Sequence, residues 1–157
     1  MIVERDTVRA ILLTDANEVL LFRTHAPDES EYFWVTPGGG LEPGETPEQA
    51  LRRELREELS LDQFVMGPLV WRRQHTFNWA GKRICQRERY YVARVDRFEP
   101  HPSDDEGEDL GQFRWWLAAE LAHARERLTP LSLAQIVADY LTEGPPREPL
   151  ELEVLVD

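Results

Sequence analysis

Three glutamates near the middle of the chain have the spacing needed to act together. Glu54, Glu57 and Glu58 stand at positions i, i+3 and i+4, so on a helix their carboxylates emerge within one sector. Like charges at this spacing oppose helix formation slightly, so something should offset their repulsion. Grouped carboxylate oxygens are the ligands that Mg²⁺ or Mn²⁺ binds, with waters and phosphate oxygens completing the shell. The spacing therefore predicts a divalent-cation site that acts on a phosphate compound.

The same glutamates have a simpler interpretation as a solvated acidic face with arginine partners. Arg52, Arg53 and Arg56 lie in the same segment and could supply those partners. The surroundings favour the functional interpretation, because a tight glycine turn lies just upstream and Glu45 stands at the entrance of the segment. Arg53 is also placed to orient a neighbouring carboxylate. We therefore treat the segment as a candidate metal site and keep the solvated face as its alternative.

Residues 46–59 are predicted to form the helix that carries these side chains. Thr46 can cap this helix, and Pro47 suits its first turn. Apolar residues repeat at helical spacing and predict a stripe that packs on a sheet; they are Ala50, Leu51, Leu55 and Leu59. Upstream, the glycine run at 38–40 lets the backbone turn sharply and approach a ligand or a neighbouring strand. The helix and the glycine run together would position the acidic face.

The rest of the chain alternates between strand-like and helical patterns. The predicted strands are 7–13, 19–23, 32–36, 64–73, 84–95 and 112–117, with a weaker one at 150–156 in a C-terminal tail, 144–157; the further predicted helices are 118–127 and 129–142. This order predicts an α+β fold in which a mixed β-sheet is flanked by helices. The length favours a single domain over residues 1–157.

Composition limits the partners that the chain can bind. Thirty acidic against eighteen basic residues give a formal net charge of −12, which argues against binding to a nucleic-acid polymer. The charge is compatible with solubility alone, or with a phosphate substrate if divalent cations are present. Cys85 is the one cysteine, so it has no internal disulfide partner, and we expect it to be a small buried residue. Because no membrane-length apolar run or leader is evident, a cytoplasmic location is expected.

The segment from Gly39 to Leu61 resembles the box of the Nudix hydrolase family, whose pattern is Gly-x5-Glu-x7-Arg-Glu-U-x-Glu-Glu-x-Gly-U, with U a bulky aliphatic residue. The matching residues are Gly39, Glu45, Arg53, Glu54, Leu55, Glu57, Glu58 and Leu61. Ser60 stands where the pattern has glycine. That glycine ends the box helix in a left-handed conformation, which costs serine about 1 kcal/mol. The departure concerns helix termination and leaves every proposed ligand in place.

The resemblance implies an α/β/α sandwich and a pyrophosphohydrolase activity. In the family, box glutamates hold divalent cations that bridge a diphosphate, and water attacks one phosphorus. Carried onto this chain, Glu57 and Glu58 would be the main ligands of Mg²⁺ or Mn²⁺, Glu54 a further ligand or water-orienting group, and Arg53 their structural partner. Gly39 would contribute backbone close to the metal. Relatives often form dimers, so a homodimer that exchanges the strand at 150–156 is one further expectation.

The general base and the substrate contacts are less defined by the sequence. Glu106, with Glu108 as its alternate, occupies an acidic stretch placed like the loop that completes the site in many relatives, although a solvated charge run is an equal interpretation. Arg23 is a candidate for substrate binding that could equally be a packing residue. Trp79 adjoins a predicted hairpin tip, where an exposed indole could stack on a base.

Markers of the known subfamilies are mostly missing. Thr76, for example, stands near the position where many ADP-ribose hydrolases have proline. A nucleoside triphosphate or another nucleotide derivative is therefore the first expectation, with ADP-ribose or another nucleotide sugar as the alternative. A non-catalytic nucleotide-binding domain and an isomerase that uses Cys85 are rival classes. The glutamates of the box argue against the first of these rivals, and the second needs further residues that cannot be placed around Cys85.

Overall fold

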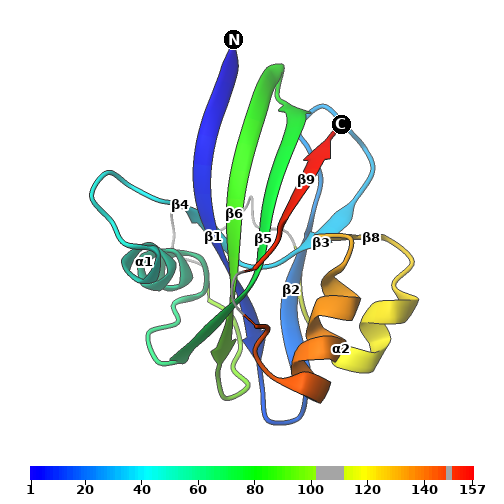
Figure 1. Cartoon of the computed structure of the whole chain (residues 1–157). Coiled ribbons are helices and arrows are strands. Elements are labelled where there is room, and N and C mark those ends of the chain that lie inside the picture. The colour runs from blue at the N-terminus through cyan, green and yellow to red at the C-terminus, as the bar shows by residue number, and fades with distance from the viewer. Residues whose placement is uncertain (102–111, 148–149) are drawn as a thin grey trace.

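The computed structural model describes residues 1–101, 112–147 and 150–157. Its elements are, in chain order, β1 (Ile2–Leu13), β2 (Glu18–Thr24), β3 (Phe33–Val35), β4 (Gly38–Gly40), α1 (Pro47–Leu59), β5 (Val65–Trp79), β6 (Lys82–Arg94), β7 (Gln112–Leu117), the 3₁₀ helix η1 (Ala118–His123), β8 (Arg127–Thr129), α2 (Leu133–Glu143) and β9 (Leu152–Val156). Figure 1 shows α1 on one side of a curled sheet and α2 with η1 on the other. None of the helices in the described ranges has the length and apolar character needed to span a membrane.

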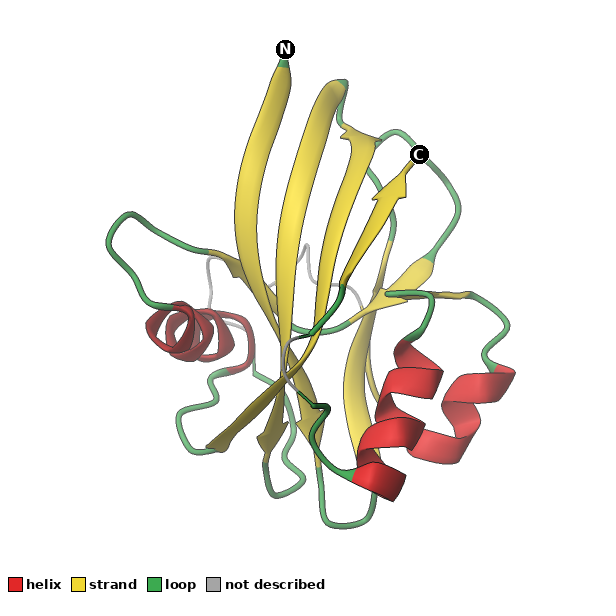
Figure 2. Ribbon diagram, in the orientation of Figure 1, coloured by secondary structure: helices red, strands yellow, loops and turns green. Residues whose placement is uncertain are grey.

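The strands form one mixed sheet, as predicted. Their order is β8-β3-β2-β1-β6-β5-β9, with β4 also paired to β1 and β7 to β2. The pairs β1–β6, β3–β8 and β5–β9 are parallel, and the other pairs are antiparallel. The long strands β1, β6 and β5 run side by side through the centre of the molecule (Figure 2). The predicted strand in the C-terminal tail is confirmed as β9 at the edge of the sheet.

Strand β1 divides the hydrophobic core into two parts, because alternate side chains point to opposite faces of a sheet. Val8, Ala10 and Leu12 pack in the cluster that contains the apolar stripe of α1. Ile11 and Leu13 pack in the cluster that contains residues of η1 and α2. All four predicted stripe residues of α1 are buried, which confirms that this helix lies on the sheet through its apolar face.

The ends of α1 form by the local chemistry that the sequence predicts. The Thr46 hydroxyl accepts a hydrogen bond of 3.2 Å from the Gln49 amide, and the Gln49 side chain accepts one of 3.0 Å from the Thr46 amide. At the other end Ser60 adopts φ 56° and ψ 33°, the predicted left-handed conformation. Its hydroxyl donates to the carbonyl of His101, a contact that glycine could not make. This hydrogen bond offsets part of the backbone cost of serine at that position.

The predictions for residues 118–142 were partly wrong. The segment predicted as a helix at 118–127 forms only the short η1, and Arg127–Thr129 instead forms β8 beside β3. The last helix begins at Leu133 and not at Thr129. Pro130 supplies the physical reason, since a residue that precedes proline is disfavoured in the helical region and favoured in the extended one. The strand pairing with β3 then holds Thr129 in the sheet.

Candidate active site

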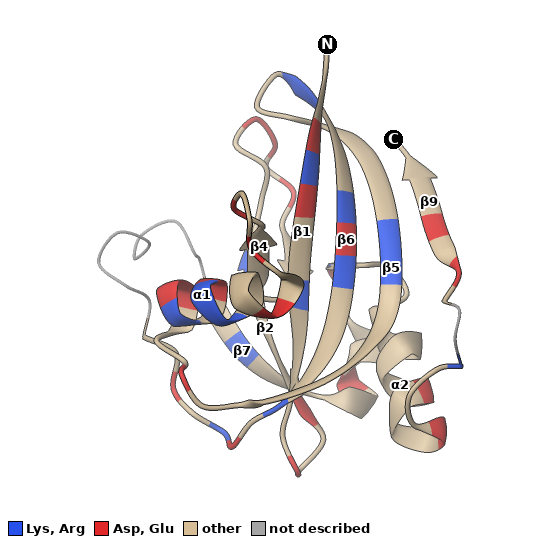
Figure 3. Cartoon of the chain, turned by 60° about the vertical axis from the view of Figure 1, so that its left-hand side comes forward, with Lys and Arg blue, Asp and Glu red and all other residues tan. Residues whose placement is uncertain are grey.

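Arg53 lies at the centre of the acidic side chains on α1. Its guanidinium donates two hydrogen bonds of 2.8 Å to the carboxylate of Glu45 and one of 2.9 Å to that of Glu54. It also donates to Glu57 at 3.4 Å and to the carbonyl of Gly40 at 2.9 Å. Figure 3 shows the mixture of acidic and basic residues along this helix. Arg53 thus holds Glu45 and two of the three predicted metal ligands, and it ties the helix to β4.

The contacts of Glu45 keep its side chain ionised far below the usual range. Hydrogen bonds from Arg53, followed by one from the amide of Glu42, lower the pKa of Glu45 from 4.5 to about 2. The hydrogen bonds with Glu45 are also the largest cause of a raised pKa of Arg53. Glu45 is therefore a permanent anion that fixes Arg53 in place at the entrance of α1.

Glu58 and Glu54 approach the glycine run of β4. The side chain of Glu58 is buried, and its carboxylate accepts a hydrogen bond of 3.0 Å from the amide of Gly38. A Cβ atom added at Gly39 would lie 2.4 Å from the carboxyl carbon of Glu54. Any side chain at position 39 would displace the Glu54 carboxylate from the space that it occupies. The close approach predicted for the glycine run is made both to α1 and to β1, with which β4 pairs.

The donor set suits a hard divalent cation in kind, although its side chains do not converge on one point. Among the described residues, no three carboxylate, imidazole or thiol groups are grouped closely enough to hold a metal ion. Glu54 and Glu57 turn toward Arg53, and Glu58 turns toward Gly38. The available ligands are oxygen atoms on one helix beside a glycine backbone, which is the chemistry that Mg²⁺ prefers. Glu57 can turn most readily, since 44% of its side chain is exposed.

A cavity of about 510 Å³ lies on the face of the sheet that points away from α1. Arg5 and Arg9 of β1 line it, whereas Val8 between them packs in the core beneath α1. Further cavity residues come from β5 and β6, among them Arg73 and Glu88. Another hollow of about 520 Å³, beside residues 62–65, contains none of the predicted site residues.

Glu88 is the centre of a buried charged cluster in the wall of this cavity. Its carboxylate accepts hydrogen bonds of 2.7 Å from Arg73 and 2.6 Å from the hydroxyl of Tyr90, and it lies 3.7 Å from the guanidinium of Arg9. Only 3% of the Arg73 side chain and 2% of the Glu88 side chain are exposed. Burial would raise the pKa of Glu88, but Arg9 and Arg73 reverse this effect and lower the pKa. We call these four residues the Glu88 cluster.

Two arginines connect the cavity with the acidic face of α1. Arg9 donates to the carbonyl of Gly38 at 3.3 Å, and the amide of the same glycine donates to Glu58. Burial and the neighbouring Arg9 lower the pKa of Arg5, while Glu54 on α1 and Glu88 in the cavity both oppose that shift. Arg5 therefore lies within the electrostatic field of both groups of acids. A chain of hydrogen bonds through Gly38 thus links Arg9 in the wall of the cavity to Glu58 in the predicted metal site.

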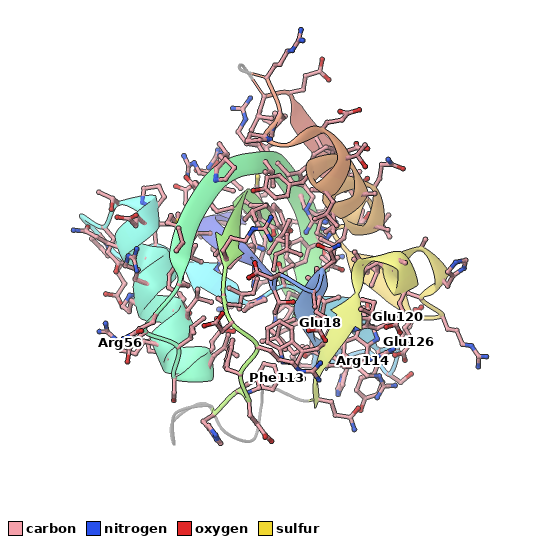
Figure 4. All side chains as sticks on the ribbon, turned by 90° about the horizontal axis from the view of Figure 1, so that it is seen from below. Glu18, Arg56, Phe113, Arg114, Glu120 and Glu126 are labelled. Carbon is pink, nitrogen blue, oxygen red and sulfur yellow. The ribbon has the colours of Figure 1, made fainter. Side chains whose placement is uncertain are left out.

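The structure brings one of the two predicted substrate-binding side chains to the cavity. Trp79, at the end of β5, lines it. Arg23 is absent from its lining and forms hydrogen bonds of 2.7 and 2.8 Å with Glu126, while its guanidinium lies 3.8 Å above the ring of Tyr32. Figure 4 labels Glu126 near η1, far from Arg56 on α1. The role of Arg23 in substrate binding stays a prediction, but these contacts are sufficient to explain its position.

Of the remaining predicted residues, two lie outside the described part of the chain and one is buried. Glu106 and Glu108, the candidates for the general base, are outside the described residues. Cys85 is buried, as expected. His75 lines the cavity and has its Nε2 atom 2.6 Å from a carboxylate oxygen of Asp157.

Sequence reasoning missed the cavity cations and the Glu88 cluster. The missed residues are Arg5, Arg9, Arg73, Glu88 and Tyr90. A signal was available, because alternation along a strand puts Arg5 and Arg9 on the same face as the core residues Ile11 and Leu13 in β1, and Glu88 on the same face as Val92 in β6. Charged side chains on an inward face need partners, and this requirement could have indicated a buried polar site.

Comparison with known proteins establishes the family. The model of the NUDIX domain matches residues 3–139. The chain belongs to the Nudix family. This membership confirms the predicted resemblance, and the matched range extends far beyond the box itself. The family generally uses divalent metals, which agrees with the oxygen donors on α1.

Curated relatives of this Nudix chain carry the name RNA pyrophosphohydrolase. The protein of Vibrio atlanticus is 32% identical over 97 residues, which cover 54% of this chain and 56% of that protein. The protein of Yersinia enterocolitica is 32% identical over 101 residues, which cover 58% and 55% of the two chains. The chain thus spans about half the length of the curated relatives it matches. Their names agree with the predicted class of enzyme, a hydrolase of pyrophosphate bonds.

Solved structures share the fold over most of this Nudix chain. The E. coli ORF135 protein has a TM-score of 0.65 and 24% identity, and the match covers 93% of this chain and 96% of that one. E. coli dihydroneopterin triphosphate pyrophosphohydrolase has a TM-score of 0.65 and 18% identity, with 89% and 98% covered. At these identities the likeness shows the fold alone, and it confirms the predicted Nudix-type α+β architecture.

Proposed function

We propose that this Nudix chain uses Mg²⁺ or Mn²⁺ to hydrolyse a nucleoside diphosphate linked to another moiety, with a nucleoside triphosphate or a similar nucleotide derivative as substrate. The observation that carries the proposal is the hydrogen-bonded link between the acidic face of α1 and the cavity. Arg9 contacts the backbone of Gly38, whose amide is bound by Glu58. A phosphate chain that starts in the cavity would therefore reach the carboxylates of α1.

The side chains of α1 would have different roles at the phosphate chain. Glu57 and Glu58 would be the main metal ligands, and Glu54 a further ligand or the group that orients the attacking water. When bound, the metal neutralises phosphate charge and polarises the phosphoryl oxygens. Arg53 acts through the carboxylates, because its hydrogen bonds to Glu45 and Glu54 fix their positions. The close packing of Glu54 on Gly39 fixes that carboxylate from its other side.

The cavity has the chemical groups that a nucleotide needs. Arg5 and Arg9 place positive charge at the end of the cavity near α1, where it would attract phosphate oxygens. Trp79 and Phe77 place aromatic rings in the cavity wall on β5, where a base could stack. Glu106 would complete the site as general base, with Glu108 as the alternate.

An RNA 5′ end is a second candidate substrate. The curated relatives named RNA pyrophosphohydrolase favour it. The net charge of −12 disfavours contacts along a long nucleic-acid backbone, so only the terminal nucleotide would enter the cavity. ADP-ribose, other nucleotide sugars and binding without hydrolysis are the further alternatives. All of these alternatives would use the same box residues and differ in the compound that the cavity would hold.

A substrate panel with matched variants tests the proposal. The panel contains nucleoside triphosphates, ADP-ribose, a nucleotide sugar and a 5′-triphosphate RNA, each with and without Mg²⁺, and the phosphate-containing products are identified. We expect Glu57→Gln to reduce kcat on the order of 100-fold while the protein stays folded, because it weakens a metal ligand. Glu48→Gln is the control, since Glu48 lies on the same helix and its contact is an exposed pair with Arg52.

Two results would contradict the proposal. Full turnover by Glu57→Gln would remove the metal assignment. Hydrolysis of no compound in the panel by the folded wild-type protein, with nucleotide binding retained, would favour the non-catalytic alternative.

A further inference from the structure

Strand β9 completes the cavity although it lies outside the residues matched by the family model, 3–139. It pairs in parallel with β5, from Arg72 opposite Leu152 to Thr76 opposite Val156. Figure 1 shows it as the outermost strand beside β5. Leu155 and Asp157 line the cavity. The strand is therefore a wall of the candidate substrate site and not only an extension of the sheet.

Three contacts fix the position of this wall on β5 and β6. Arg72 donates to the carbonyl of Leu150 at one end of the strand. At the other end, the amide of Asp157 donates to the carbonyl of Thr76 at 2.9 Å. Arg83 donates to the backbone oxygen of Asp157 at 2.8 Å. Because both of its ends are held, β9 presents the Asp157 side chain at a defined place.

Asp157 adds a carboxylate to a row of rings on the cavity side of β5. The ring centroids of His75 and Phe77 are 4.8 Å apart, and those of Phe77 and Trp79 are 6.4 Å apart. All three rings line the cavity. One carboxylate oxygen of Asp157 lies 2.6 Å from Nε2 of His75, so the other oxygen has capacity to accept further hydrogen bonds. The wall thus combines flat apolar surfaces with an anionic acceptor.

We propose that β9 determines base specificity in this site: a nucleobase stacks on one of the rings of β5, and the carboxylate of Asp157 accepts a hydrogen bond from an amino group of that base. This inference rests on the proposed function, because it places the phosphates at Arg5 and Arg9 on β1 and the base at β5 and β9, on the other side of β6. Bases that carry an amino group would be preferred over those without one. His75 is a positioning residue that orients the carboxylate.

Paired nucleotides that differ in one amino group test the inference. GTP is compared with ITP, and CTP with UTP, by kcat/KM in the presence of Mg²⁺ and by quenching of tryptophan fluorescence, which reports binding without turnover. We expect the wild-type protein to prefer GTP and CTP about tenfold, the effect of one hydrogen bond to a charged acceptor. Asp157→Ala should abolish that preference, so that the variant treats the two members of each pair alike.

The same strand provides the control. Val154→Thr changes a side chain that is 56% exposed on the opposite face of β9, and it should keep the full preference. If Asp157→Ala does not fold, a variant that lacks residues 150–157 takes its place, with folding checked by circular dichroism. An unchanged GTP-to-ITP ratio in a folded Asp157→Ala or truncated protein would overturn the inference, as would a wild-type protein without preference. A protein that binds nucleotides with the predicted preference but hydrolyses none would contradict the proposed function alone.

Discussion

Two clusters of charged side chains in this protein are built in different ways. The Arg53 cluster, which consists of Arg53 with Glu45, Glu54 and Glu57, comes from one helix and its entrance, and 22% of the Arg53 side chain is exposed. The Glu88 cluster joins side chains of β1, β5 and β6, and its central pair is almost fully buried. The first cluster contains two of the proposed metal ligands, whereas the second lies in the wall of the cavity. The clusters differ both in exposure and in composition, since the first surrounds one arginine with glutamates and the second surrounds one glutamate with arginines and a tyrosine.

The difference in exposure has a consequence for what each cluster contributes. Ion pairs that water can still reach contribute little to stability, so the main consequence expected of the Arg53 contacts is the placement of carboxylates. A buried charge that loses its partner is costly, because neither water nor another charge compensates it. Disruption of the Glu88 cluster should therefore lower the stability of the fold more than it weakens substrate binding. Each of the following variants tests one side of this comparison.

The largest effect is expected for the buried arginine. Arg73→Met leaves Glu88 without its closest cation and should lower the free energy of unfolding by about 3 kcal/mol, measured by urea denaturation. Arg53→Met should lower it less but abolish most of the hydrolysis, because 17% of the Glu45 side chain and 16% of the Glu54 side chain stay exposed to water, while their positions matter for the proposed chemistry. Equal losses of stability in the two variants would show that exposure does not distinguish the clusters.

A second effect concerns how tightly the Arg53 cluster is packed against β4. Gly39→Ala places a Cβ atom 2.4 Å from the carboxyl carbon of Glu54 and should reduce kcat about 100-fold, the effect of a misplacement of about 1 Å. At Gly40, the nearest atom to an added Cβ lies 3.4 Å away at the end of the Arg5 side chain, so Gly40→Ala is the matched control and should retain activity. If Gly39→Ala were as active as Gly40→Ala, the position of Glu54 would not matter for turnover.

The smallest effect is a titration within the Arg53 cluster. Because the folded-state pKa of Glu45 is about 2 and its ordinary value is 4.5, the stabilising contact with Arg53 is present above pH 4.5 and is lost as the pH falls toward 2. The carboxyl carbon of Glu45 should therefore titrate near pH 2 in an NMR experiment, and in Arg53→Met it should return toward 4.5. A wild-type midpoint close to 4.5 would contradict the contact itself.

The Arg53 cluster and its helix could be predicted from the sequence because their determinants are local. The cap at Thr46, the apolar stripe and the left-handed Ser60 all follow from residues within a few positions of one another. The start of the last helix was predicted wrongly, since the pairing of β8 with β3 joins segments far apart in the chain. Parallel pairing of this kind leaves no short-range signal apart from the proline at 130.

The sequence by itself determined the family, the helix and the set of acidic side chains on it, because spacing along a helix places those side chains on one face whatever surrounds them. Only the tertiary structure decided which residues form the cavity. Arg9, Arg73, Glu88 and Asp157 come from four different strands, and their meeting depends on the order and register of the sheet. Strand register is set by the packing of the whole sheet, so the wall of the site emerges when the chain folds.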